Sequence, residues 1–182
     1  MKVETKLTNK FVEIISKHQN ALWAREELEY LVFVAHRDEY EQLSLEEKRD
    51  VLPRFFKTGK GEYGEGDRFM GVAVPDIRKV AKLHNDASYE VLDALLESEW
   101  HEARLCALVI LAERFKRDSE TAVKFYLNHM KGINNWDLVD LSAPYILGVY
   151  LLDKNDRQVL YRLAESDVMW EQRVAIVSTL ML

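Results

Sequence analysis

The chain has 182 residues, of which 48% are hydrophobic and 31% charged, as expected for one folded domain or a stretch of a repeat array. Its longest apolar runs, residues 30–35 and 106–112, are too short to span a bilayer, and its first residues lack the apolar stretch of a signal peptide. The single cysteine, Cys106, excludes an internal disulfide and favours a cytoplasmic location, and the net charge of −6 argues mildly against a nucleic-acid partner.

Helical periodicity covers almost the whole chain. We expect helices near residues 8–18, 21–36, 45–57, 75–84, 89–97, 101–117, 120–131, 135–152, 156–165 and 170–182. Residues 44–47, SLEE, form a capping-box pattern, whereas residues 30–35, YLVFVA, would also suit a short strand. We expect four serines to act as N-caps: Ser88, Ser98, Ser119 and Ser166.

Residues 58–71, TGKGEYGEGDRFMG, contain five of the seven glycines. A phosphate-binding loop is one interpretation, but no Gly-Lys-Ser/Thr occurs and no strand precedes the segment. Glu62, Glu65 and Asp67 would also repel a phosphate. We therefore expect a flexible surface loop between two helices.

Two segments of the chain resemble each other. WHEARLCA at residues 100–107 and WDLVDLSA at residues 136–143 share Trp, Leu and Ala at the same offsets, and WEQRVA at residues 170–175 is a looser copy. A repeat of this length in paired helices is typical of a HEAT-like α-solenoid, although leucine-rich helices also resemble each other by chance. We expect an all-α solenoid of antiparallel helix pairs, forming a single domain over residues 1–182 with a concave binding face.

Aligning the three copies on their alanines places polar side chains at one shared position. Arg104, Asp140 and Gln172 occupy this position, and Arg173 follows it. In successive second helices of a solenoid, such side chains would lie along one face of the superhelix. This face is the predicted binding surface.

The usual signatures of metal or nucleophilic catalysis do not occur. The five histidines have no metal-binding spacing, and HEARL at residues 101–105 lacks the second histidine of a zinc protease. We therefore expect His101 to lie at the surface or to cap a helix. We expect Cys106, inside an apolar helical run, to be a buried small hydrophobic residue and not a nucleophile.

The segment NNWDLVDLSAPYILG, residues 134–148, carries carboxylates on an apolar helix. Trp136 and Asp140 are four residues apart and so lie on one face, where a ring and a carboxylate can contact one small group. Asp137 lies in the first turn, where the helix dipole favours an anion, and Asn134 or Asn135 would be the cap. For Asp140, a salt bridge to Arg104 or Arg173 is as plausible as a functional role.

Three stretches of the chain resemble a known family. Residues 54–82 (RFFKTGKGEYGEGDRFMGVAVPDIRKVAK), 134–148 (NNWDLVDLSAPYILG) and 170–180 (WEQRVAIVSTL) are similar to the bacterial DNA alkylation repair family of HEAT-like DNA glycosylases, the AlkD type. The resemblance implies excision of cationic N3- or N7-alkylated purines from duplex DNA, without a metal, a cofactor or a deep base pocket. It also implies further helices after Leu182, so we expect the sequence to lack the family's C-terminal helices.

The resemblance also implies roles for individual residues. The family's catalytic tryptophan and aspartate fall on Trp136 and Asp140, and its arginine falls on Arg173. The aromatic residue of its Arg-Tyr-x-Lys stretch falls on Phe55, which keeps the ring and lacks the hydroxyl. We expect four residues to contact DNA: Phe55, Lys57, Arg104 and Arg173.

The chemistry suits these residues, because an alkylated purine is cationic and leaves without being protonated. The sugar that becomes positive needs a fixed carboxylate, which Asp140 would supply while Trp136 packs on the sugar and the base. We expect a monomer, associated with the nucleoid when it is bound to damaged duplex DNA. The alternative is a non-catalytic solenoid that binds DNA or protein through the same face, with Asp140 merely paired.

Overall fold

Residues 42–182 are described by a computed structural model of the chain. The chain divides into two compact units, Met1–Ser44 and Leu45–Leu182, and the second is described below. The predictions for residues 8–18, 21–36 and 30–35 fall outside the described residues. The single domain predicted over residues 1–182 stays a prediction.

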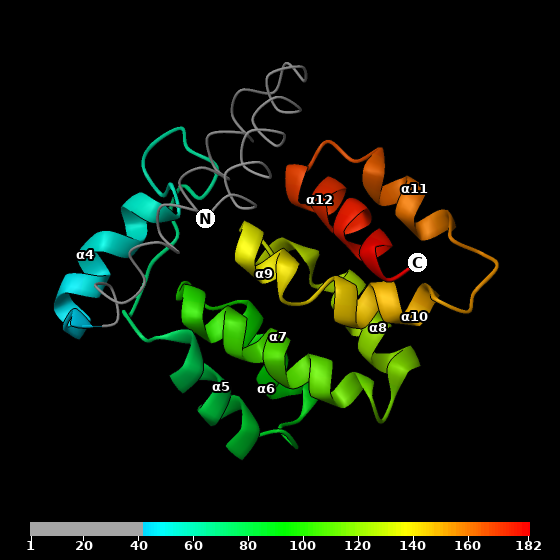
Figure 1. The fold of residues 1–182 in the computed structure, drawn as a ribbon, viewed down its shortest axis with the longest axis horizontal. Coiled ribbons are helices and arrows are strands. Elements are labelled where there is room, and N and C mark those ends of the chain that lie inside the picture. Colours follow the sequence, from blue (N-terminus) through cyan, green and yellow to red (C-terminus); the bar gives the residue numbers. More distant parts are fainter. Residues whose placement is uncertain (1–41) are drawn as a thin grey trace, which may run out of the picture. The chain divides into compact units, whose positions relative to one another are not determined.

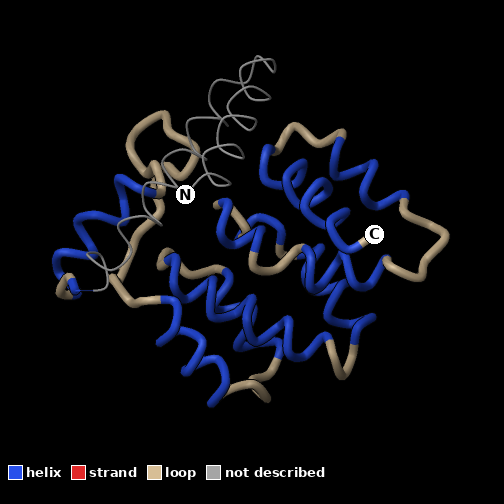
Figure 2. The backbone as a smooth tube through the Cα atoms, in the orientation of Figure 1, coloured by secondary structure: helices blue, strands red, loops and turns tan. Residues whose placement is uncertain are grey.

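The regular elements of the described residues are all helices, apart from an isolated bridge between Arg68 and Trp100, and loops and turns connect the helices (Figure 2). The helices are α4 (Leu45–Phe55), α5 (Val74–Leu83), α6 (Tyr89–Leu96), α7 (His101–Phe115), α8 (Ser119–Asn128), α9 (Trp136–Asp140), α10 (Val149–Leu151), α11 (Gln158–Ala164) and α12 (Met169–Ser178), with short helical segments η1 (Met130–Gly132), η2 (Pro144–Gly148) and η3 (Thr179–Met181). The all-α class is confirmed for these residues. Within residues 42–182, no helix combines the length and the apolar character needed to cross a membrane.

Helix α7 forms the centre of the second unit. It packs against α5, α6 and α8, and in Figure 1 it lies between α5 and α9. Leu105, Ala107, Leu108 and Leu111 are at most 1% exposed, because apolar residues occur on every side of this helix. Cys106 is also buried, as predicted, and its burial raises the pKa of the thiol.

Helix α12 packs on α9, α11 and η2 (Figure 1). Val174 and Ala175 are the buried residues of its centre, while Ile176 is 67% exposed. This contact brings α12 beside the segment around Trp136 that carries the candidate functional residues.

The predicted serine caps are only partly correct. Ser88 occupies the N-cap position of α6, although its side chain makes no capping hydrogen bond. Helix α8 is capped by Asp118, whose Oδ1 accepts from the backbone N–H of Thr121 at 3.2 Å, so Ser119 is the first helical residue and the prediction for it is wrong. Asp and Ser are both favoured at the N-cap, so the adjacent residues Asp118 and Ser119 were equally good candidates from the sequence.

Ser98 and Ser166 lie two residues before the helical N-cap residue, in one local structure repeated before α7 and α12. Each serine Oγ accepts from the backbone N–H two residues later, at 3.2 and 3.0 Å. Arg104 and Gln172, each six residues after its serine, donate to the serine carbonyl at 2.7 and 2.6 Å. Arg104 and Gln172 are the residues that the alignment of the repeat copies placed at one position. Helices α7 and α12 therefore share the hydrogen bonds at their starts.

The single helix predicted over residues 135–152 is interrupted. Helix α9 ends at Asp140, residues 141–143 form a turn, and η2 is a π-helical segment in which the N–H of Gly148 donates to the carbonyl of Ala143 at 2.9 Å. Pro144 explains the interruption, because it has no N–H to donate to the carbonyl of Asp140 and its ring crowds that carbonyl. Asp140 is therefore the last residue of α9.

Candidate functional site

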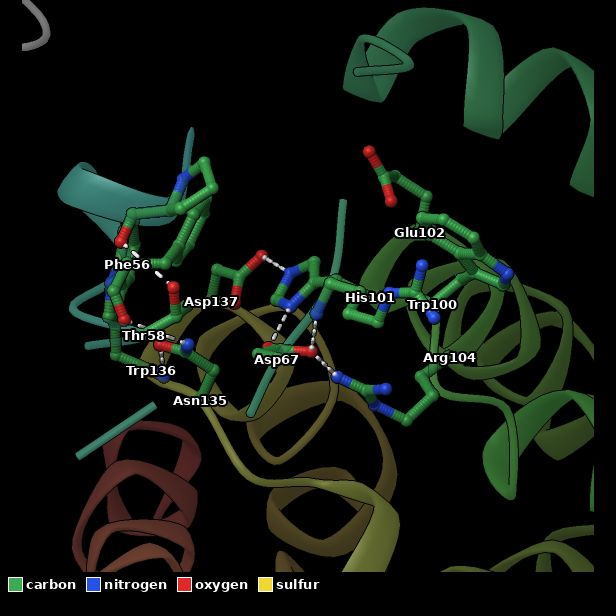
Figure 3. Close-up of polar contacts among 12 residues, drawn as sticks. Phe56, Thr58, Asp67, Trp100, His101, Glu102, Arg104, Asn135, Trp136 and Asp137 are labelled. Atoms are coloured by element: carbon green, nitrogen blue, oxygen red, sulfur yellow. Dashed lines mark hydrogen bonds and ion pairs between the residues drawn. The ribbon is translucent and has the colours of Figure 1, made fainter. Parts of the chain in front are cut away.

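The start of α9 is held by its cap. The side chain of Asn135 accepts from the backbone N–H of Trp136 at 2.9 Å, which confirms the predicted cap, and its Nδ2 donates to the carbonyl of Phe56 at 3.5 Å (Figure 3). Asn135 is fully buried, so both contacts are shielded from water. The cap thus ties the first residue of α9 to the segment after α4.

Trp136 packs among aromatic rings from the end of α4. Its ring lies 5.7 Å from that of Phe55 in an edge-on arrangement and 5.6 Å from that of Phe56 in a nearly parallel one. Such contacts hold the indole in one orientation. The structure therefore brings together Trp136 and Phe55, two of the predicted site residues.

Asp140 and Arg173 form a bidentate ion pair between α9 and α12. Nε of Arg173 donates to Oδ1 at 3.0 Å and Nη2 donates to Oδ2 at 2.8 Å. The side chain of Asp140 stays 37% exposed and that of Arg173 22% exposed. Of the two partners predicted for Asp140, the structure selects Arg173.

Lys57 lies just after α4, at the start of the glycine-rich segment. Its backbone has a φ of 52°, a left-handed conformation that ends the helix, and its carbonyl accepts from the N–H of Gly64 at 2.9 Å. The predicted DNA contacts of Lys57 and Phe55 stay predictions. Both residues lie on the chain segment that packs against α9.

The prediction that His101 lies at the surface or caps a helix is wrong. His101 is 2% exposed and lies between two carboxylates (Figure 3). Its Nδ1 is 2.8 Å from Oδ2 of Asp67, and its Nε2 is 2.7 Å from Oδ2 of Asp137. The rings of Phe56 and Phe69 pack on the imidazole with centroids 4.8 and 4.6 Å away. Asp137 does lie in the first turn of α9, but it also takes part in a buried ion pair.

The charges of this cluster determine its protonation. Burial opposes a charged imidazole, but the charges and hydrogen bonds of Asp137 and Asp67 outweigh that effect and raise the pKa of His101 to about 9. Burial likewise opposes ionisation of Asp67, yet His101 and Arg104 hold the pKa of that carboxyl below its usual value. At neutral pH the protonated imidazole therefore donates to both carboxylates.

Arg104 belongs to the buried cluster of His101 and forms its ion pair with Asp67, not with Asp140. It is 5% exposed, and its Nη2 pairs with Oδ1 of Asp67 (Figure 3). Its Nη1 donates to the carbonyl of Ser98 at 2.7 Å. The predicted DNA contact of Arg104 stays a prediction, and in this structure its guanidinium neutralises Asp67.

The glycine-rich segment is attached to α7 by a carboxylate. Oε1 of Glu102 accepts from the N–H groups of Met70, Gly71 and Val72 at 3.0, 2.8 and 3.2 Å. A positive φ of 87° at Gly71 allows these consecutive N–H groups to point at one acceptor. The anion-binding part of this segment is thus occupied by a side chain of the protein itself.

Sequence reasoning missed Asp67, His101 and Asp137 as one cluster. One signal could have found part of it, because His101 and Asp137 are 36 residues apart and so occupy equivalent positions in the first two copies of the repeat. Residues at equivalent positions of stacked repeats lie near each other. Within residues 42–182, no group of His, Cys, Asp and Glu side chains is arranged to hold a metal ion.

Comparison with known proteins places the chain beside one family. A family model described as DNA alkylation repair enzyme matches residues 36–182, which include every residue of the site above. No curated protein and no solved structure matches the chain.

Proposed function

Because the chain belongs to the DNA alkylation repair enzyme family, we propose that it is a DNA glycosylase that removes cationic N3- or N7-alkylated purines from duplex DNA. Membership of the family indicates an enzyme of DNA repair that has DNA as its partner. The choice of glycosidic-bond hydrolysis, of alkylated purines and of duplex DNA is our inference from the resemblance described in the sequence analysis, together with the residues of α9 and α12.

The observation that carries the proposal is the arrangement of Trp136, Asp140 and Arg173. The carboxylate of Asp140 is one turn from the indole, is held at both oxygens by Arg173, and keeps more than a third of its side chain exposed. A carboxylate fixed in this way can meet a substrate without first being ordered, which is the basis of electrostatic catalysis.

The proposed reaction uses the positive charge that alkylation has already placed on the base. As the glycosidic bond breaks, the electron pair goes to the purine, which becomes neutral, and the sugar becomes an oxocarbenium-like cation. Asp140 stabilises this cation and orients the water that attacks it, and the proton of that water passes to solvent. Trp136 packs its π face on the cationic base and the sugar. The scheme uses no metal, no cofactor and no deep pocket for the base.

In this proposal Arg173 has two tasks. It orients Asp140 in the free protein, and in the complex its guanidinium contacts a phosphate beside the lesion. Phe55 supports the indole from the side, and Lys57 contacts the phosphate backbone.

The helix repeat suggests how DNA would reach these residues. The shared hydrogen bonds of Arg104 and Gln172 support a repeated unit of the HEAT type, in which Asp140 occupies the same position one repeat from each. DNA lying along the second helices of such a stack would meet Asp140 between neighbouring units.

The decisive experiment measures release of methylated purine from alkylated duplex DNA. We expect the wild type to release it and Asp140→Asn to be slower by about 100-fold or more, because one preorganised charge is lost. Asp86→Asn is the control, since Asp86 is exposed on the turn after α5, and its rate should equal that of the wild type. If the wild type and Asp140→Asn release equally little, the glycosylase proposal is wrong.

A second function is favoured by the ion pair itself, because Arg173 already neutralises Asp140. In that case the chain would be a non-catalytic solenoid that binds DNA or protein. A gel-shift series over increasing salt separates the cases: binding through phosphates must weaken as salt rises, with Asp140→Asn binding as tightly as the wild type and no base released by either.

A further inference from the structure

The His101 cluster joins three segments that are far apart in the sequence. Asp67 belongs to the glycine-rich segment, His101 is the first residue of α7, and Asp137 is the second residue of α9. The side chain of His101 is 3% exposed and that of Asp137 11% exposed, so neither meets a substrate directly. Any effect of the cluster on a substrate must therefore pass through other residues of the protein.

The residues on which it acts are those of the proposed site. Asp137 follows Trp136 directly and precedes Asp140 by one helical turn, all three on the five-residue helix α9. A helix this short has little stability of its own, so its position depends on what its side chains contact. The first turn of α9 is held by the Asn135 cap, by the packing of Trp136 on Phe55 and Phe56, and by the His101–Asp137 pair.

We propose that His101 is a positioning residue for base excision, which holds the first turn of α9 so that Trp136 and Asp140 present one fixed geometry to the substrate. The proposal rests on the proposed glycosylase function. It assigns to His101 an effect on the rate of the chemical step, beyond its contribution to the stability of the fold.

The mechanism depends on the charge of the imidazole. A protonated ring donates to Asp67 and to Asp137 at once, whereas a neutral ring has one N–H and turns a lone pair toward the other carboxylate. Three charged groups lie in this cluster beside His101: Asp67 and Asp137 contact the imidazole, and Arg104 pairs with Asp67. When His101 loses its proton, Asp67 still pairs with the guanidinium of Arg104, but Asp137 loses the positive charge of the imidazole. The attachment of α9 to His101 then weakens.

His129→Gln provides a matched control for His101→Gln. Nε2 of His129 lies 2.7 Å from Oδ1 of Asp93, again 36 residues apart, but this pair joins α6 to the end of α8 and is partly exposed. Single-turnover excision and affinity for undamaged duplex are measured for both variants, below their unfolding temperatures. We expect His101→Gln to slow the chemical step by about 10- to 100-fold, with affinity changed less than about twofold, and His129→Gln to change neither.

The pH profile of the wild type provides a second test, and Asp137→Asn shows whether the fall belongs to His101. The wild-type single-turnover rate should fall as pH rises through about 9, where His101 loses its proton. In Asp137→Asn the same fall should occur about one pH unit lower or more, because the carboxylate that favours the proton is gone. Spontaneous loss of base from the same DNA without protein is subtracted at each pH.

Failure of the glycosylase proposal and failure of the role of His101 give different results in these experiments. If the wild type releases no base at any pH, the glycosylase proposal is wrong and this inference is wrong with it. If the wild type is active, the inference alone is overturned by folded His101→Gln that excises as fast as the wild type, or by a wild-type profile without a fall between pH 8 and pH 10. Equal slowing by His101→Gln and His129→Gln would also overturn it, because it would indicate general destabilisation.

Discussion

Arg173 donates hydrogen bonds to both carboxylate oxygens of Asp140, which lies 33 residues earlier in the sequence, and neither side chain is fully buried. A bidentate pair of this kind orients a carboxylate precisely while leaving part of it in contact with water. The contribution of this ion pair to the free energy of unfolding can therefore be measured separately from its contribution to activity.

For the pair of Asp140 and Arg173, we predict a small effect on stability. Asp140→Asn should lower the free energy of unfolding by about 1 kcal/mol or less, since partly exposed ion pairs contribute little. Urea denaturation of Asp140→Asn, Arg173→Gln and the double variant gives the coupling energy directly. A loss of about 3 kcal/mol or more for the single variant would indicate a structural charge pair and would favour the non-catalytic function.

For Glu102, we predict a large effect on stability. Glu102→Gln replaces a charged acceptor by a neutral amide: its oxygen can still accept from the N–H groups of residues 70–72, but its NH₂ group then faces the N–H of Met70, and the free energy of unfolding should fall by about 1.5–3 kcal/mol. Hydrogen exchange of the same amides should speed up in parallel. Glu113→Gln, on the exposed face of α7, should change stability by about 0.5 kcal/mol or less. Similar losses for both variants would contradict the anchoring role of Glu102.

For His101, we predict a stability that declines at alkaline pH. Its folded pKa of about 9 lies above the ordinary value of 6.5, so protonation stabilises the fold fully below pH 6.5, and this contribution is lost as pH rises to about 9. The decline should amount to a few kcal/mol, measured by urea denaturation between pH 6 and pH 9.5. The decline should be absent in His101→Gln and present in His129→Gln. A wild type equally stable at both ends of this range would contradict the protonated bridge.

For the glycine-rich segment, we predict that two glycines differ in their tolerance of alanine. A Cβ at Gly64 would lie 2.4 Å from the carbonyl oxygen of Phe56 and 3.1 Å from Nδ2 of Asn135, so Gly64→Ala should cost about 1–3 kcal/mol and disturb the cap of α9. A Cβ at Gly59 would meet mainly the flexible side chain of Glu62, so Gly59→Ala should cost less. Thermal unfolding of the two variants checks the order, and the reverse order would contradict the close packing of Gly64.

The helices and much of the local structure could be predicted because they depend on neighbouring residues. Periodic apolar positions predicted α4 to α8, α11 and α12 within a few residues, and Asn135 was identified as a possible cap of α9. The spacing of Trp136 and Asp140 placed both on one helix face. Pro144 carries the signal for the break after Asp140, although the apolar pattern around it predicted one continuous helix.

What remained open in the sequence depends on contacts between distant segments. Whether Asp140 pairs with Arg104 or with Arg173 is decided by α12 lying against α9, and HEARL gives no local sign that His101 is buried between two carboxylates. A charge is tolerated in the interior only where an opposite charge from elsewhere in the chain reaches it, and that meeting is a property of packing. The amino-acid sequence by itself determined where the helices form. Which charged side chains pair with one another was decided by the packing of those helices in the tertiary structure.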